Sequence, residues 1–270
     1  MIRLSDTEFG QFQRFIFETA GITLTDAKKA LVSGRLAKRV SACQSKSYGE
    51  YFRLLGKSPQ ELQNAVDLLT TNETYFFREP KHFQFLKRYI TSGEARSTAV
   101  RVWSAAGSSG EEAYSIAMLL EDCLTGQPWE VVASDISARV LERARAGHYS
   151  MDRIDNFPPG YLQRFCLKGK DAQEGTLLVE RRLRNKVRFL QVNLNASLPH
   201  LGTFDVIFLR NVLIYFNTET KRKVVGRVLS VLKPGGYLLI GHSESLIEVT
   251  EAVELAAPAI YRYAGRRKPK

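Results

Sequence analysis

Several residues with useful chemistry stand directly after short apolar segments that are typical of buried strands. They are the small-residue segment 104–110 with Glu111 and Glu112 behind it, Asp135, Asn193 with Leu194, and Arg210 with Asn211. In an open α/β sheet, a ligand binds in the crevice beyond the carboxyl ends of the strands. Polar groups at four such ends therefore predict one site, suited to an adenosine-containing cofactor.

The residue types at these positions match parts of such a cofactor. The carboxylate of Asp135 can accept hydrogen bonds from both ribose hydroxyls, because its two oxygens match paired O–H donors. Asn193 and Leu194 offer an amide and an apolar side chain to an adenine ring. The segment 104–110, SAAGSSG, lets the backbone turn sharply and approach a ligand. By itself, this segment is also compatible with an ordinary tight turn.

Two cofactors compete for a site of this kind. The phosphates of NAD would be repelled by Glu111 and Glu112, which stand at the expected helix start. The segment is neither a Walker A loop nor a clean G-x-G-x-x-G fingerprint. S-adenosylmethionine has no phosphate, and its ammonium and sulfonium groups favour a nearby carboxylate. The two acids therefore favour S-adenosylmethionine.

An alternation of strands and helices from residue 99 onward must position these residues. The expected strands are 100–103, 131–134, 187–191, 204–209, 237–240 and 259–263, and the expected helices are 111–121, 138–146 and 218–232. Such alternation predicts an α/β fold, with a parallel sheet flanked by helices. The irregular stretch of about 148–186 includes the strand-like segment 176–180, which predicts a small β insertion.

Residues 1–70 show helical periodicity and no strand signal. Ser5 and Glu8 predict a capping box at the first helix, and Gly21 predicts its end. A second helix, expected at about 25–43, carries four basic residues near one face, namely Lys28, Arg35, Lys38 and Arg39. Most stripes of this kind are solvated surface, so the pattern alone assigns them no partner.

The composition fits a globular protein that carries a large positive charge. The chain has 270 residues, of which 44% are hydrophobic, and its formal net charge is +11. It has no apolar run of transmembrane length, and its first residues are too polar for a signal peptide. Its three cysteines are far apart and form no C-x-x-C. We expect a cytoplasmic protein without disulfide or metal site, and the charge favours an acidic partner.

Six motifs in fixed order resemble the CheR-type chemotaxis methyltransferases over nearly the whole chain. They are TTNETYFFRE at 70–79, WSAAGSSGEEAYS at 103–115, ASDIS at 133–137, Asn193-Leu194, LRNVLIYF at 209–216 and LKPGGYLLIGHSES at 232–245. The resemblance implies the class I fold of methyltransferases that use S-adenosylmethionine, a Rossmann-like sheet whose last strand is antiparallel. It also implies an all-helical N-terminal domain and the β insertion. The implied reaction methylates glutamate side chains of chemoreceptors, gives methyl esters and S-adenosylhomocysteine, and serves chemotactic adaptation.

The resemblance also implies domains and site residues. Residues 1–70 would dock the receptor, 71–98 would form a linker and helix over the cofactor, and 99–270 would form the methyltransferase domain. The implied cofactor contacts are Asn72, Thr74, Arg78, Glu112, Asp135, Asn193, Leu194, Arg210 and Asn211. Arg78 and Tyr215 would lie beside the transferred methyl and act in catalysis, and the choice of Glu112 over Glu111 rests on the resemblance alone. Taken alone, Arg78 could instead pair with Glu79, and Tyr215 could be a core aromatic.

The implied partners are the acidic cytoplasmic helices of chemoreceptors, which Lys28, Arg35, Lys38 and Arg39 would dock. In some members of the family, the β insertion binds a receptor C-terminal peptide by strand addition. We expect a monomer, with no nucleic-acid partner and no membrane insertion. A DNA amino-methylase would carry an Asn-Pro-Pro-Tyr-like element where this chain has 210–213, RNVL. A receptor-binding module without catalysis is the other alternative, and it predicts no cofactor binding.

Overall fold

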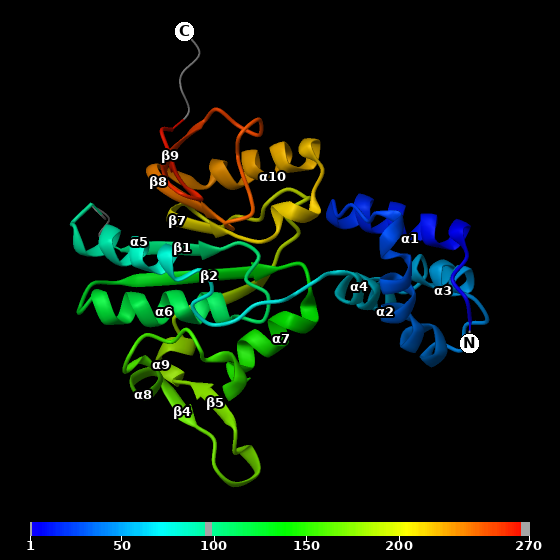
Figure 1. The fold of residues 1–270 in the computed structure, drawn as a ribbon, viewed down its shortest axis with the longest axis horizontal. Coiled ribbons are helices and arrows are strands. Elements are labelled where there is room, and N and C mark those ends of the chain that lie inside the picture. Colours follow the sequence, from blue (N-terminus) through cyan, green and yellow to red (C-terminus); the bar gives the residue numbers. More distant parts are fainter. Residues whose placement is uncertain (1, 95–98, 266–270) are drawn as a thin grey trace.

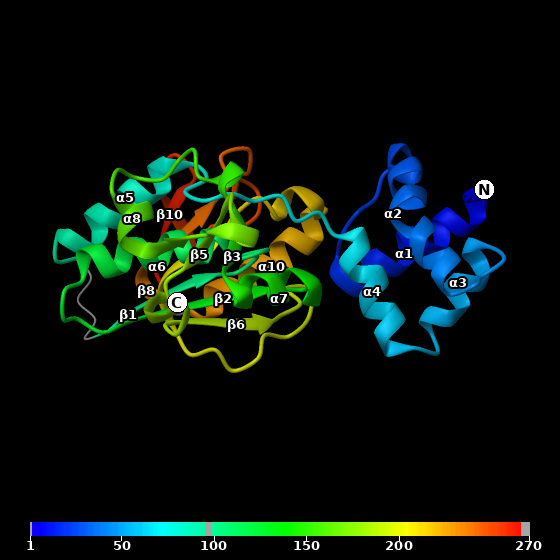
Figure 2. The same cartoon turned by 90° about the horizontal axis from the view of Figure 1, so that it is seen from below.

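A helical N-terminal domain stands at one end of a larger α/β domain, beside helices α7 (Ala138–Ala146) and α10 (Thr218–Ser230) (Figures 1 and 2). The computed structural model describes residues 2–94 and 99–265. No helix in these two ranges is both long and apolar enough to cross a membrane.

The N-terminal domain is built from four α-helices and one 3₁₀ turn among the described residues. They are α1 (Asp6–Ala20), η1 (Asp26–Lys28), α2 (Lys29–Ala42), α3 (Tyr48–Leu55) and α4 (Pro59–Leu69). The predicted capping box between Ser5 and Glu8 is confirmed, and Gly21 ends α1 in the left-handed conformation. The predicted second helix is shorter than expected, since its first turn is the separate 3₁₀ turn η1. Apolar side chains of all four helices form the domain core.

The linker from residue 70 to 79 is anchored by two phenylalanines before it enters α5 (Pro80–Thr91). Phe76 and Phe77 are both buried in the core of the α/β domain. The backbone N–H of Phe77 also donates to the Ser115 hydroxyl at 2.9 Å. The linker therefore lies on the α/β domain along a fixed course, as Figure 1 shows.

The main sheet has seven strands in the order β6-β2-β1-β7-β8-β10-β9. Its strands are β1 (Val100–Ser104), β2 (Trp129–Asp135), β6 (Val187–Gln191), β7 (Phe204–Leu209), β8 (Leu232–Ile240), β9 (Val253–Ala257) and β10 (Ile260–Tyr263). The first five strands of this order are parallel, and β10 is antiparallel to β8. The predicted class I arrangement with an antiparallel last strand is confirmed.

Helices cover both faces of this sheet. Successive residues of a strand point to opposite faces, so neighbouring residues of one strand pack in different cores. Val131 packs in the core that contains α5 and α6 (Glu111–Cys123), whereas Val132 packs in the core that contains α10. Val206 and Ile207 of β7 divide in the same way. Burial on both faces explains why these strands read as continuous apolar runs.

Two sequence expectations near the C-terminus were wrong. Helix α10 ends at Ser230 and not at residue 232, and strand β8 begins irregularly at Leu232, five residues before the expected strand start at 237. A Cβ at Gly236 would lie 2.7 Å from the Asp205 carbonyl oxygen, so the glycine at this position permits close strand pairing. Strand β9 was not expected, because it is a largely exposed edge strand whose sequence, VELAA, has only one β-branched residue.

The β insertion is a small antiparallel sheet of order β3-β5-β4 that lies against α6 (Figure 1). Its elements are β3 (His148–Ser150), η2 (Met151–Arg153), α8 (Tyr161–Phe165), β4 (Cys166–Lys168), η3 (Asp171–Gln173), β5 (Thr176–Val179) and α9 (Arg181–Arg184). Only β5 was predicted as a strand. The Tyr149 hydroxyl donates to the Ser109 carbonyl oxygen at 2.7 Å, which joins the insertion to the turn before α6.

Replacing Gly110 by Ala is expected to destabilise the protein by about 2 kcal/mol or more. Gly110 has a φ of 98°, and an added Cβ would lie 2.8 Å from the Tyr149 hydroxyl and 2.9 Å from Ala144 Cβ. Urea unfolding measures the loss.

The matched control is Gly34→Ala, within α2, where an added Cβ meets nothing within 4 Å. This change is expected to raise stability by up to about 1 kcal/mol, because alanine is the better helix former. A Gly110→Ala variant as stable as the wild type would contradict this account of the turn.

Candidate functional site

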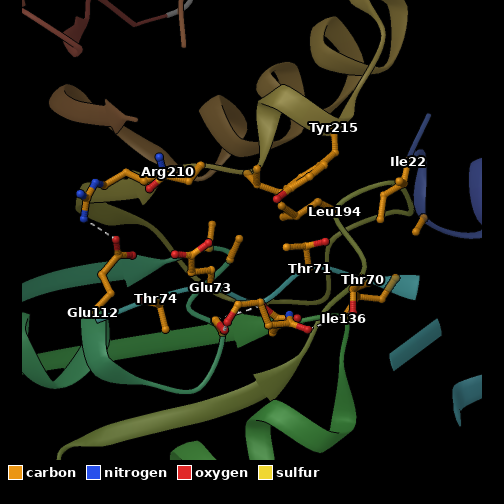
Figure 3. A pocket seen from close by; sticks show the side chains of 18 of the residues that line it. Ile22, Thr70, Thr71, Glu73, Thr74, Glu112, Ile136, Leu194, Arg210 and Tyr215 are labelled. Atoms are coloured by element: carbon orange, nitrogen blue, oxygen red, sulfur yellow. Dashed lines mark hydrogen bonds and ion pairs between the residues drawn. The ribbon is translucent and has the colours of Figure 1, made fainter. Parts of the chain in front are cut away.

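A pocket of about 830 Å³ lies at the carboxyl ends of β1, β2, β6 and β7, under the linker (Figure 3). The N-terminal domain contributes Ala20 and Ile22 to its wall. All ten residues expected at the cofactor or the methyl group line this pocket: Asn72, Thr74, Arg78, Glu112, Asp135, Asn193, Leu194, Arg210, Asn211 and Tyr215.

Asp135 ends β2 with a carboxylate that is almost fully buried. One oxygen accepts the Ser108 N–H at 3.0 Å and the other accepts the Ser137 N–H at 2.9 Å. Burial raises the pKa of Asp135 to about 6, although these N–H groups act in the opposite direction. At neutral pH the side chain is therefore an oriented anion, and its remaining lone pairs can accept the hydroxyls of a vicinal diol.

Arg210 is a buried cation held between two carboxylates. Its side chain is 1% exposed, with Nη1 2.7 Å from Glu112 Oε2 and Nη2 3.0 Å from Glu79 Oε2. Burial alone would raise the pKa of Glu79, but the Arg210 guanidinium beside it brings this pKa below its ordinary value. Figure 3 shows Arg210 and Glu112 facing each other across one end of the pocket.

This charged end of the pocket suits an amino-acid zwitterion. Glu112, which also accepts the Ser104 hydroxyl at 2.7 Å, can receive an ammonium group. Among the residues that the structure describes, the buried Nε–H of Arg210 has no hydrogen-bond partner. A ligand carboxylate is the natural acceptor for such a donor. Glu111, in contrast, is buried outside the pocket lining and accepts the Ser109 hydroxyl.

The opposite end of the pocket is largely apolar. Ile136, Val192 and Leu194 line it together with Phe216. Asn193 also lines the pocket, but its amide donates to the Thr19 carbonyl oxygen at 2.6 Å and accepts the Asn195 N–H. The Asn193 side chain therefore also holds the pocket wall against α1. The apolar residues at this end provide a surface for an aromatic ring.

Arg78 and Tyr215 reach the pocket from the linker and from the segment after β7. The Arg78 guanidinium donates to the Glu73 carbonyl oxygen at 2.9 Å and lies 5.6 Å from the centroid of the Tyr75 ring. Among the described residues it forms no ion pair with Glu79, which pairs with Arg210 instead. The half-buried Tyr215 points toward the pocket in Figure 3. Both side chains retain polar atoms that a second substrate could contact.

Glu244 is a site residue that the sequence analysis did not single out. Its carboxylate accepts the backbone N–H groups of Asn211, Gly241 and Ile214 at 2.8, 2.6 and 3.2 Å. Asn211 has a φ of 56°, so this segment adopts an uncommon backbone conformation. One carboxylate thus holds the segment that carries Arg210 and Tyr215. In the sequence, Glu244 could have been recognised as an acid that follows closely after an apolar strand, within the GHSES motif.

The four basic residues expected to dock a receptor are not equally available. Arg39 forms an ion pair with Glu61, and Arg35 donates to the carbonyl oxygens of Leu69 and Thr70 at 3.1 Å. Lys28 and Lys38 are exposed. Two of the four side chains therefore hold the N-terminal domain and linker together, and two face solvent.

Comparisons with known proteins give a consistent assignment over both domains. The family model "CheR methyltransferase, all-alpha domain" matches residues 7–70, and "CheR methyltransferase, SAM binding domain" matches residues 72–261. A chemotaxis protein methyltransferase of Escherichia coli (strain K12) is 40% identical over 267 residues, which cover 96% of this chain and 92% of that protein. Chemotaxis protein methyltransferase 2 of Pseudomonas aeruginosa is 38% identical, over 94% of this chain and 92% of its own length.

Replacing Asp135 by Asn is expected to remove part of the pH dependence of folding stability. Because burial raises the pKa of Asp135 to about 6 from the ordinary value of 3.8, the folded state binds this proton more tightly than the unfolded chain does. Its contribution to stability is complete below the unfolded pKa and is lost as pH rises through the folded pKa. The loss is about 1 kcal/mol between about pH 5 and about pH 7.5.

Urea unfolding at these two pH values measures the difference. The matched control, Asp155→Asn, changes an exposed carboxyl outside the pocket and should keep the wild-type pH dependence. An Asp135→Asn variant whose stability still falls by the wild-type amount would show that Asp135 is not the group responsible.

Proposed function

This chain belongs to the CheR family of chemotaxis protein methyltransferases, and from that premise we propose how its pocket serves methyl transfer. As a member of this family, it methylates chemoreceptors with S-adenosylmethionine. We infer that the acceptors are glutamate side chains and that the products are glutamate methyl esters and S-adenosylhomocysteine. The observation that carries this proposal is the pocket that combines Asp135 with the paired charges of Glu112 and Arg210.

The pocket offers a partner for each part of the cofactor. Asp135 would accept the ribose hydroxyls, Glu112 would accept the ammonium group and Arg210 would bind the carboxylate. Leu194 and its apolar neighbours would contact the adenine ring. The other proposed contacts are Asn72, Thr74, Arg78, Asn193 and Asn211, all of which line the same pocket. When bound, S-adenosylmethionine supplies an electrophilic methyl group on a sulfonium centre.

Arg78 and Tyr215 are the proposed catalytic residues. A glutamate side chain is already ionised at neutral pH, so the enzyme needs no general base to activate it. The Arg78 fork would orient the carboxylate and leave one oxygen free to attack. The Tyr215 hydroxyl would add a hydrogen bond near the reacting atoms. The linker and the N-terminal domain, which cover the pocket, would limit the access of water.

The proposed partners are acidic cytoplasmic helices of chemoreceptors. Methylation removes one negative charge from such a helix, which fits a role in adaptation. The exposed Lys28 and Lys38 could contact the receptor surface, with Arg35 and Arg39 in the same helical region. The insertion sheet, of order β3-β5-β4, could add a receptor C-terminal peptide at an outer strand. We propose a cytoplasmic monomer that needs no nucleic acid, metal or membrane insertion.

Methyl transfer to a receptor cytoplasmic fragment tests this proposal. The wild type should form alkali-labile methyl esters on glutamate, detected by mass spectrometry. Tyr215→Phe should lower kcat about tenfold, the equivalent of one hydrogen bond, with little change in cofactor affinity.

Tyr263→Phe, a buried tyrosine of β10 outside the pocket, is the matched control and should retain wild-type kcat. Wild-type kcat in Tyr215→Phe would remove Tyr215 from the catalytic residues. Failure of the wild-type protein to bind the cofactor would favour a receptor-binding module instead.

A further inference from the structure

A second cleft, of about 820 Å³, adjoins the cofactor pocket and carries an excess of positive charge. Three arginines line it: Arg35 from α2, and Arg139 and Arg143 from α7. No aspartate or glutamate is among its lining residues in the described parts of the chain. Thr70 and Asn72 of the linker line both cavities, so one short segment of backbone separates them.

One acid beside this cleft, Asp67, is engaged by backbone donors. Asp67, at the end of α4, is almost fully buried, and its carboxylate accepts the backbone N–H groups of Ala138 and Arg139 at 3.0 and 3.2 Å. It therefore caps the start of α7 and stabilises the contact between the two domains. The Arg139 side chain reaches only the carbonyl oxygen of Asp67, at 3.1 Å.

Within residues 2–94 and 99–265, neither Arg35 nor Arg143 forms an ion pair with a carboxylate. Arg35 donates to backbone carbonyl oxygens and to the Thr71 hydroxyl, and both burial and the like charge of Arg139 lower its pKa. Arg143 follows Arg139 by four residues, which places the two exposed side chains on one face of α7. Like charges at this spacing repel each other, so an anion placed between them would relieve an unfavourable arrangement.

We propose that this cleft binds a carboxylate of the substrate protein, on an acidic side chain that flanks the glutamate in the cofactor pocket. The inference rests on the proposed function, because the acceptor must then be a segment rich in carboxylates. Its shared wall with the pocket allows one segment to occupy both cavities. In a helical substrate, the flanking acid would stand three, four or seven residues from the target, on the same face.

This subsite gives the α/β domain a direct part in choosing the substrate. A carboxylate bound by Arg139 and Arg143 stabilises the bound substrate equally before and during methyl transfer. Such uniform binding lowers KM and leaves kcat unchanged. Because the arginines are partly open to solvent, added salt should weaken this contribution.

The test uses Arg143→Glu and two helical peptides that share one target glutamate. One peptide carries glutamates three, four and seven residues from the target, and the other carries glutamines there. With the acidic peptide, Arg143→Glu should raise KM about tenfold at constant kcat, whereas with the neutral peptide it should match the wild type. A third peptide with lysines at these positions should bind Arg143→Glu more tightly than it binds the wild type.

The matched control is Arg145→Glu, on the same helix but outside the cleft, where Arg145 donates to the Phe189 carbonyl oxygen. It should keep the wild-type KM for the acidic peptide. Equal KM values for Arg143→Glu and the control would overturn the proposal. The proposal would also be overturned if Arg143→Glu raised KM equally for the acidic and neutral peptides. The same holds if Arg143→Glu weakened binding to anionic vesicles or oligonucleotides but left binding of the acidic peptide unchanged.

Fluorescence anisotropy of the labelled peptides separates this proposal from the proposed function. If the wild type bound the acidic peptide through Arg143 but formed no methyl ester, the subsite would stand and the assigned reaction would fail. In the converse case, wild type and Arg143→Glu would methylate both peptides at equal rates and bind them with equal affinity. The assigned reaction would then stand and the subsite would fail.

Discussion

The buried guanidinium of Arg210 joins three parts of the chain that are far apart in sequence. Glu79 comes from the linker, Glu112 from the first turn of α6, and Arg210 itself follows β7. Arg210 also donates to the backbone carbonyl oxygen of Arg78 at 2.6 Å, so it fixes the linker where that segment crosses the pocket. Removing one partner from a buried ion pair leaves an uncompensated charge, which is strongly destabilising. The pocket's charged end thus exists only when all three parts are in place.

The N-terminal domain completes the same structure from the other side. The Thr23 N–H donates to the Tyr215 carbonyl oxygen at 2.9 Å, and a β-bridge joins Ile22 to Phe216. Glu244 holds the other side of this segment through backbone N–H groups. The segment that carries Tyr215 is therefore fixed by both domains. A domain proposed to recognise the substrate is physically part of the wall of the cofactor pocket, which links substrate recognition to the geometry of catalysis.

Local sequence patterns predicted much of the fold and placed four polar groups at strand ends on one edge of the sheet, and residues of all four groups line one pocket. The strand, small-residue turn and helix at 100–121 and the acid at Asp135 follow from rules of α/β sheets, which place strand ends together. The roles of Arg78 and Tyr215 came from resemblance, since nothing local in TTNETYFFRE or LRNVLIYF gives them a function. Glu244 and the Arg210 partners could not be predicted, because they depend on contacts between residues more than 30 positions apart. Strand β9 was missed because it is a largely exposed edge strand with only one β-branched residue.

Titration of S-adenosylhomocysteine into wild type and Arg210→Lys tests most directly whether the buried Arg210 assembles the cofactor site. Lysine keeps the charge but cannot contact two carboxylates and a carbonyl oxygen as a planar fork does. We expect the variant to fold and to bind the product at least about tenfold more weakly than the wild type does. Arg222→Lys, which changes an exposed arginine of α10, should bind like the wild type. Wild-type affinity in a folded Arg210→Lys variant would contradict the account.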